Sequence, residues 1–230
     1  MKRGFLTLVA AGALALGTPA LAEETSGLSL SGEIGVVSDY QYRGYSLSGG
    51  DWALQGGLTV NAPSGFYATV WSSMIEEYGI GADGDGAKAE VDVSLGRAFS
   101  AGGIDWDASF QYYGYPDGTD VDFYETILTA SRTTGAFTAT VGVEYAPSQD
   151  NLGGDDNSYF FLGGDYAPEH WPVSLSARIG HEDGAFADGK LDWSVGAART
   201  FGPVTVNLIW TDSDGPGAEG TLSGGIVASF

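Results

Sequence analysis

The sequence contains no cysteine. Disulfide bonds, thiolate metal sites and a lipid-modified N-terminal cysteine are therefore excluded. No stretch beyond the first residues approaches the roughly 20 apolar residues that a membrane-spanning helix needs. Histidine is scarce as well, with only His170 and His181, and neither belongs to a motif in which a third group would orient it as a base. We therefore predict no enzymatic activity, no metal site and no cofactor.

Basic residues are also few. Nine Lys and Arg stand against 30 Asp and Glu, which gives a formal net charge of -21. Nucleic-acid binding depends on clustered Lys and Arg, so no nucleic-acid partner is expected. A charged share of only 17% beside 13% aromatic residues argues against an intrinsically disordered chain. The 37 glycines favour a β protein with many turns.

Residues 1–22 have the pattern of a secretory signal peptide. Met1-Lys2-Arg3 is basic, an apolar run extends from Phe5 to Leu16, and Ala20-Leu21-Ala22 is a cleavage site of small residues. We expect this segment to be removed. The mature length, 23–230, suits a single domain of the barrel or sandwich kind.

The mature sequence alternates between apolar and polar residues with a period of two, which indicates β-strands. About twelve such segments occur, each near the roughly 9 to 11 residues of a tilted transmembrane strand. The first is expected to extend from Leu28 to Arg43. Two others, Phe66 to Ile75 and Val121 to Arg132, are apolar on both faces, so their phase stays open.

The connections between these segments alternate between long acidic loops and short, nearly uncharged turns. Gly44 to Asp51 and Glu182 to Gly189 are examples of the loops, whereas Ala62 to Gly65 is one of the turns. Long loops outside and short turns in the periplasm are typical of bacterial outer-membrane barrels. We predict an all-β fold, a single transmembrane antiparallel barrel of about 12 strands. A soluble sandwich or lipocalin-like barrel would explain the alternation but not this rhythm or the aromatic last residue, Phe230.

The polar faces of the strands are expected to line the lumen, because lipid does not tolerate them. The candidate pore-lining residues are Glu33, Asp39, Arg43, Lys88, Glu90, Asp92, Asp105, Asp107, Glu144, Asp165, Arg178, Lys190 and Asp192. Nine are acidic and four basic, and acidic linings lower the barrier for cations. A closed lumen, in which Arg43 and Arg178 only pair with acids, remains the alternative.

Two further groups are expected at the membrane interfaces. Arg97, Arg132 and Arg199 fall near the ends of strands that descend to the short turns, at the level of the periplasmic headgroups. The tryptophans are expected in aromatic girdles; they are Trp52, Trp71, Trp106, Trp171, Trp193 and Trp210.

Several motifs resemble the TorF-type porin family of proteobacteria. The matching runs are SDYQYRG at 38–44, GFYATVWSS at 65–73, and YYGYP at 112–116 followed by FYE at 123–125. The resemblance implies an outer-membrane barrel of porin type and says little about the solute. Ser223, Gly225, Ala228 and Phe230 also look like the C-terminal signal read by the barrel-assembly machinery. The expected surroundings are outer-membrane lipids and lipopolysaccharide.

Together these patterns predict a passive, narrow outer-membrane channel for small cationic or neutral solutes. A non-conducting structural or adhesive barrel is the first alternative, and conductance would separate the two. A soluble periplasmic ligand-binding β protein is the second, and fractionation would distinguish it.

Overall fold

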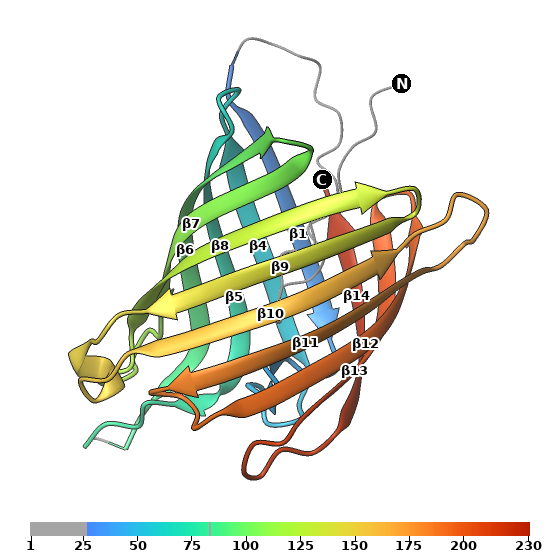
Figure 1. Ribbon diagram of the computed structural model, residues 1–230. Helices are drawn as coiled ribbons and strands as arrows, with labels where there is room; N and C mark the ends of the chain where they lie inside the picture. The colour runs from blue at the N-terminus through green and yellow to red at the C-terminus, as the bar shows by residue number, and fades with distance from the viewer. Residues whose placement is uncertain (1–26, 83) are drawn as a thin grey trace.

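The computed structural model describes residues 27–82 and 84–230, so the expected signal peptide lies outside the described residues. Twelve antiparallel strands form a closed barrel in which each strand pairs with its neighbours along the chain and the last pairs with the first (Figure 1). The barrel strands are β1 (Ser29–Val37), β4 (Ala53–Asn61), β5 (Phe66–Tyr78), β6 (Ala87–Ala101), β7 (Ile104–Gly114), β8 (Phe123–Thr134), β9 (Phe137–Ala146), β10 (Asn157–Tyr166), β11 (Ser174–Gly184), β12 (Lys190–Phe201), β13 (Val204–Ser213) and β14 (Thr221–Ser229). The predicted all-β barrel is confirmed.

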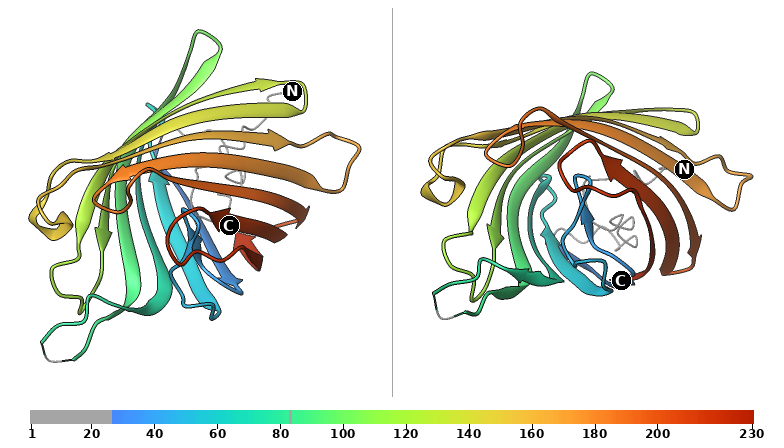
Figure 2. Two further views of the ribbon diagram at one scale, coloured as in Figure 1. Left: turned by 60° about the horizontal axis from the view of Figure 1, so that its bottom comes forward. Right: turned by 90° about the horizontal axis from the view of Figure 1, so that it is seen from below.

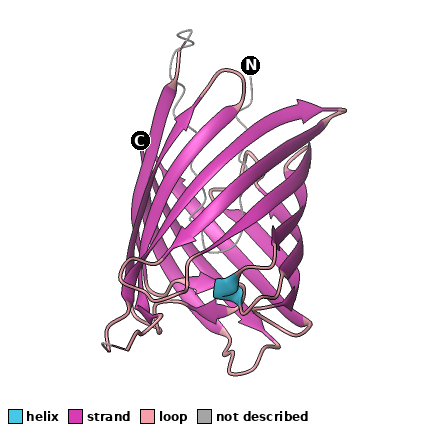
Figure 3. Cartoon of the chain, turned by 90° about the vertical axis from the view of Figure 1, so that its left-hand side faces the viewer, coloured by secondary structure: helices cyan, strands magenta, loops and turns pink. Residues whose placement is uncertain are grey.

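Strand connections separate by length onto the two rims. Short turns at 62–65, 102–103, 135–136 and 202–203 lie at one rim, and loops lie at the other (Figure 3). The connection at 167–173 is the one turn longer than its companions. The short helix η1 (Asp150–Leu152) belongs to a loop, and no helix among the described residues is long and apolar enough to cross a bilayer.

The outer wall of the barrel is apolar. Leu58, Val70 and Leu162 are 51%, 52% and 54% exposed, although each belongs to the middle of a strand. A continuous exposed band of such residues is stable only in lipid. The chain is therefore an outer-membrane barrel, with the short-turn rim in the periplasm and the loop rim outside.

The barrel closes between β1 and β14. Ile34 faces Ala228 in the register of this pair, and Gly32 and Phe230 exchange backbone hydrogen bonds of 2.8 and 2.9 Å. The Phe230 ring covers Gly32 on the outer wall, where a Cβ would lie 2.7 Å from the ring. The terminal aromatic residue thus fills the space that a glycine leaves at the seam.

The first strand is shorter than predicted. β1 ends at Val37, and residues 38–52 turn into the lumen instead of continuing the wall (Figure 2). Within this segment β2 (Gln41–Tyr42) and β3 (Tyr45–Ser46) form a small hairpin, which we call the inner hairpin. At the same rim of the barrel, β11 is longer than predicted and includes Glu182, which the sequence had suggested for a loop.

In β5 and β8, the sequence did not show which face meets lipid, because both strands also carry apolar residues that face inward. Trp71 on β5 is 8% exposed and lies edge-on to Tyr40 beside the inner hairpin, with ring centroids 5.6 Å apart. Its expected place in a membrane girdle is therefore wrong. On β8, Phe123 and Ile127 face inward and are buried.

Candidate functional site

The inner hairpin turns at Arg43 and Gly44. Their φ angles are 45° and 85°, the signs required by a type I′ turn between paired strands. A non-glycine residue in this conformation costs about 1–3 kcal/mol, so Arg43 must be held by other contacts. Gly44 has no alternative, because a Cβ there would lie 2.5 Å from the Cβ of Ser213 on β13.

The guanidinium of Arg43 is held by three glutamates of the barrel wall. Its Nη1 donates to Glu182 on β11 at 2.5 Å, and its Nη2 donates to both carboxylate oxygens of Glu125 on β8 at 3.1 and 3.2 Å. Nη2 also pairs with Glu144 on β9, the strand opposite β1 in the ring. The side chain is 1% exposed, so the ion pairs lock the hairpin across the lumen.

Two more cations complete this network. Lys190 on β12 pairs with Glu182 at 2.7 Å and donates to the backbone oxygen of Arg43 at 2.6 Å. Arg178 on β11 pairs with Glu144 at 3.5 Å. We call Arg43, Arg178, Lys190, Glu125, Glu144 and Glu182 the arginine knot. Its three positive and three negative groups balance, so the knot carries no net formal charge.

An aromatic ring supports the knot from one side. The guanidinium carbons of Arg43 and Arg178 lie 4.3 and 5.2 Å from the centre of the Tyr159 ring, within cation–π range. Tyr159 is fully buried and donates to Asp192 at 3.0 Å. It lies over Gly180, where a Cβ would come within 2.1 Å of its hydroxyl. The glycine therefore makes room for the ring that packs against both arginines.

Three further inward acids, Glu90, Asp92 and Asp107, accept hydrogen bonds from neutral partners, whereas the buried carboxylate of Glu33 has no hydrogen-bond partner among the described residues. Glu90 accepts hydrogen bonds from the Tyr40 and Tyr115 hydroxyls, each at 2.8 Å. Asp92 accepts from Gln111 at 3.0 Å, and Asp107 accepts from Tyr67 at 2.9 Å. Burial raises the pKa of the Tyr115 hydroxyl in the loop after β7, which keeps it a donor. Outside the knot, the inward wall is therefore negative.

The structure places the predicted pore-lining residues in four settings. Buried inward positions on the wall hold Glu33, Glu90, Asp92, Asp107, Glu144, Lys190 and Asp192, and half-buried ones hold Asp165 and Arg178. Arg43 and Asp39 belong to the segment inside the lumen, where Asp39 accepts from Ser46 and Ser48 at 2.6 and 3.0 Å. Asp105 lies at the periplasmic rim and accepts from Ser100 at 2.5 Å.

Lys88 is the fourth case and differs from the expectation. Its side chain is 73% exposed and lies 3.4 Å from Glu77 near the start of β6. It belongs to the outer rim instead of the lumen, because it is the second residue of β6, directly after the loop that precedes this strand.

Two members of the knot, Glu125 and Glu182, escaped the sequence prediction. Glu125 lies on the strand whose phase stayed open, and Glu182 was assigned to an acidic loop. For Glu182 the sequence signal is parity, because it continues the inward positions Arg178 and Gly180 of its strand. For Glu125 the signal is its charge, which lipid does not tolerate on the outward face of a strand.

Above the inner hairpin, a vestibule of about 320 Å³ opens toward the loop rim. The hairpin contributes Tyr42, Tyr45 and Leu47, and the wall and loops contribute Glu76, Glu77, Tyr78, Tyr115, Phe123 and Phe186. Among the described residues, no group of three or more His, Asp or Glu side chains is arranged to hold a metal ion.

Comparisons with known proteins identify a family for this chain. A family model described as a bacterial protein of unknown function, Gcw_chp, matches residues 21–227. No curated protein matches the chain.

Several solved outer-membrane channels share the fold. The KdgM porin is 9% identical with a TM-score of 0.61, covering 87% of this chain and 99% of that one, and it has also been solved in complex with disordered oligogalacturonate. The NanC porin is 12% identical with a TM-score of 0.52, covering 87% and 98%. An outer-membrane channel from Pseudomonas putida F1 is 12% identical with a TM-score of 0.53, covering 90% and 97%. At these identities the likeness concerns the fold alone.

Proposed function

The chain belongs to the Gcw_chp family of bacterial proteins of unknown function, and we propose that it is a narrow outer-membrane channel for small solutes. The proposal is based on the closed barrel and on the contents of its lumen. Barrels of about 8 strands are filled by side chains, and barrels of about 16 leave an open channel. A barrel of twelve strands lies between these limits. A segment that folds inward can therefore set the width of the passage, and residues 38–52 are such a segment.

The observation that carries the proposal is the inner hairpin held across the lumen by Arg43. A barrel closed only by its own wall residues would need no separate element fixed by ion pairs from three strands. The hairpin leaves the vestibule above it and polar wall residues such as Asp107 and Asp165 below it. The hairpin is thus the constriction between an outer and a periplasmic half of the lumen.

The solute preference we propose is for cations or neutral molecules. The knot is balanced, and Glu90, Asp92 and Asp107 outside it have neutral hydrogen-bond partners. Acidic rings of this kind lower the barrier for positive charge. This lining does not suit a polyanion such as the oligogalacturonate with which the KdgM porin has been solved.

A non-conducting structural or adhesive barrel is the second candidate. It is favoured by the completeness of the knot, because three cations and three glutamates pair with little exposure. Hairpin contacts this tight are compatible with a permanent plug. We propose no catalytic role: His181 is exposed on β11 at a position of outward parity, and His170 lies in the connection after β10.

Three finer points belong to the same proposal. The first is membership of the TorF-type porins, supported by the runs at 38–44 and 65–73. The second is recognition of the last strand by the barrel-assembly machinery, supported by the seam contact of Phe230 with Gly32. The third is contact of the loop rim with lipopolysaccharide, which fills the outer leaflet around such rims.

Recording from planar bilayers tests the proposal. Folded protein, verified by heat-modifiable gel mobility, should give discrete conductance steps, and a potassium chloride gradient should give a reversal potential of the sign for cation selectivity. Absence of steps from folded protein, at every applied voltage, would favour the structural barrel. Steps with anion selectivity would retain the channel but overturn the proposed preference.

A further inference from the structure

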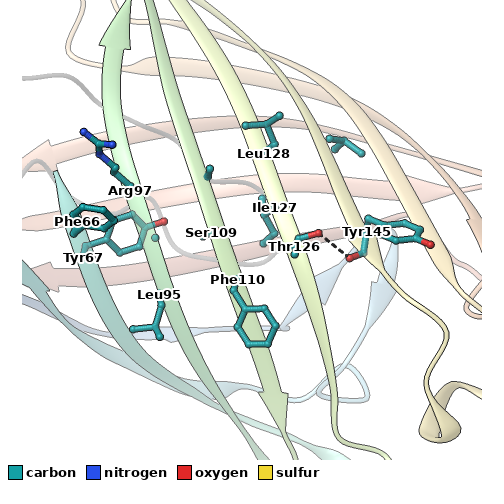
Figure 4. Close-up of a pocket in the computed structure, with 13 residues that line it drawn as sticks. Phe66, Tyr67, Leu95, Arg97, Ser109, Phe110, Thr126, Ile127, Leu128 and Tyr145 are labelled. Atoms are coloured by element: carbon teal, nitrogen blue, oxygen red, sulfur yellow. Dashed lines mark hydrogen bonds between the residues drawn. The ribbon is translucent and has the colours of Figure 1, made fainter.

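The outer wall carries a hollow of about 750 Å³ across β5 to β9 (Figure 4). Its floor is set by small side chains. In the register of the sheet, Ala108 on β7 lies between Arg97 and Leu128, and Thr126 on β8 lies between Phe110 and Tyr145. Long side chains on both sides of short ones leave a depression, because neighbouring outward side chains on a sheet stand about 5 Å apart.

The hollow is apolar over most of its surface. Leu95, Phe110 and Leu128 are 59%, 42% and 43% exposed. The hydroxyl of Thr126 donates to the backbone oxygen of Tyr145 at 3.3 Å, drawn as the dashed line in Figure 4. With this hydroxyl satisfied in the wall, the threonine can present its methyl group to the hollow. The surface is therefore suited to a hydrocarbon chain.

One end of the hollow is cationic. Arg97 lines it from β6, close to the periplasmic end of that strand, and belongs to the outward set of residues. Its guanidinium carbon lies 5.1 and 5.7 Å from the ring centres of Phe66 and Phe99. Within the part of the chain that the structure describes, no carboxylate forms a salt bridge with Arg97. The rings restrain the side chain and leave its N–H donors available.

We propose that this hollow binds a glycerophospholipid of the periplasmic leaflet, with its phosphate on Arg97 and an acyl chain along Ala108 and Thr126. A planar guanidinium matches the oxygens of a phosphate in a bidentate fashion. A charged side chain facing lipid is costly unless it reaches the headgroup layer or an anion. The volume is in the range of roughly 300–1,000 Å³ found for small-molecule sites.

The height of Arg97 on the barrel argues for a phospholipid. Lipopolysaccharide occupies the outer leaflet and would meet the loop rim, whereas Arg97 lies toward the short-turn rim. Free phosphate would gain nothing from the apolar floor. Arg199 on β12 provides a natural comparison, because it is also outward, also near the periplasmic rim and also beside a ring, with Phe201 at 4.6 Å. Arg199 does not line the hollow.

Native mass spectrometry of the folded barrel in detergent tests the assignment. The delipidated protein is titrated with dioleoyl phosphatidylglycerol and, separately, with dioleoylglycerol, which has the same chains and no phosphate. We expect a saturable phosphatidylglycerol adduct that Arg97→Gln weakens about tenfold, the effect of losing a charge-assisted contact. Arg199→Gln should leave the adduct unchanged, and Ala108→Phe should weaken it by filling the floor.

Several outcomes would overturn the assignment. Equal losses in Arg97→Gln and Arg199→Gln would indicate general attraction of headgroups to any interfacial cation. Dioleoylglycerol binding as tightly as phosphatidylglycerol would remove the role of the phosphate. Displacement of the adduct by lipid A, or a dimer in place of an adduct, would assign the hollow to another occupant. Heat-modifiable mobility verifies that each variant is folded, and Arg97→Met, which removes the charge but keeps an unbranched side chain against the rings, replaces Arg97→Gln if that variant is not.

Discussion

Arg43 and Glu144 form an ion pair across the lumen, from the inner hairpin to the strand opposite β1. The pair is buried on both sides, with 1% and 5% of the two side chains exposed. Removing one partner of such a pair costs about 3–5 kcal/mol, because the other charge stays buried without compensation. The hairpin therefore stays in place as long as the arginine knot is complete.

Replacement of Arg43 by glutamine should release the hairpin. The variant Arg43→Gln loses all three glutamate ion pairs while its side chain stays polar. If the hairpin loses about 3 kcal/mol of stabilisation, the fraction of barrels in which it has left its place should rise by about 100-fold. We expect larger or longer-lived conductance steps in planar bilayers, together with stronger cation selectivity from the unpaired glutamates.

Lys88→Gln is the matched control for this variant. It also removes one positive charge, but from an exposed side chain at the outer rim beside Glu77. Its conductance should stay at the wild-type value. If Arg43→Gln conducts like the wild type and like this control, the hairpin does not limit the passage.

The position of the constriction can be measured with single cysteines, because the chain has none of its own. Glu76→Cys lies in the vestibule above the hairpin, and Asp107→Cys lies on the inward wall nearer the periplasmic rim. A cationic thiol reagent added at the loop side should modify the first quickly and the second much more slowly. In the Arg43→Gln background the two rates should approach each other. Equal rates in the parent barrel would place the constriction elsewhere.

Selectivity should depend on the acids outside the knot. Glu90 and Asp92 are buried on β6 and have neutral hydrogen-bond partners. The double variant Glu90→Gln, Asp92→Asn keeps the shapes of the side chains while removing two negative charges, so the reversal potential in a salt gradient should fall toward zero. Asp150→Asn in the loop helix is the control and should have little effect, because exposed charges are screened by salt. A fall of equal size in both would indicate a general surface effect.

The architecture of the wall could be predicted from the sequence, because the alternation of apolar and polar residues shows which face of each strand meets lipid. This succeeds for β9, where Phe137, Val141 and Tyr145 face outward and Glu144 faces inward. It succeeds because the lipid imposes one chemical requirement on every outward position. The number of strands and the long and short connections follow from the same pattern.

The contents of the lumen could not be predicted in the same way. Tyr40 and Tyr42 continue the alternation of the first strand, yet they belong to the segment inside the barrel. A local signal existed in the two residues Arg43 and Gly44, flanked by Tyr42 and Tyr45, which fit a two-residue hairpin turn. That Arg43 would meet Glu125, Glu144 and Glu182 depends on strands 82, 101 and 139 residues away in sequence. A local sequence pattern does not show which residues meet when they are this far apart in the sequence.

Phe230 should matter for assembly beyond its contribution to stability. Its ring covers Gly32 at the seam between the last and first strands, which form the final pair as the barrel closes. Phe137 on β9 provides the matched control for Phe230. Its ring also packs over a glycine of the outer wall, 3.1 Å from the Cβ position of Gly164, but it lies away from the seam. Each substitution by alanine should lower the free energy of unfolding by about 1 kcal/mol, the upper value for a cross-strand pair.

The two variants should separate in the rate of membrane assembly. Phe230→Ala should delay the appearance of the heat-modifiable folded band after synthesis in cells, because it weakens both the seam contact and the C-terminal assembly signal that we propose. Phe137→Ala should assemble at the wild-type rate and differ only in urea unfolding from bilayers. If both variants assemble at the same rate, Phe230 acts only as a packing residue at the seam, and the recognition of the last strand must depend on its other outward positions such as Ile226.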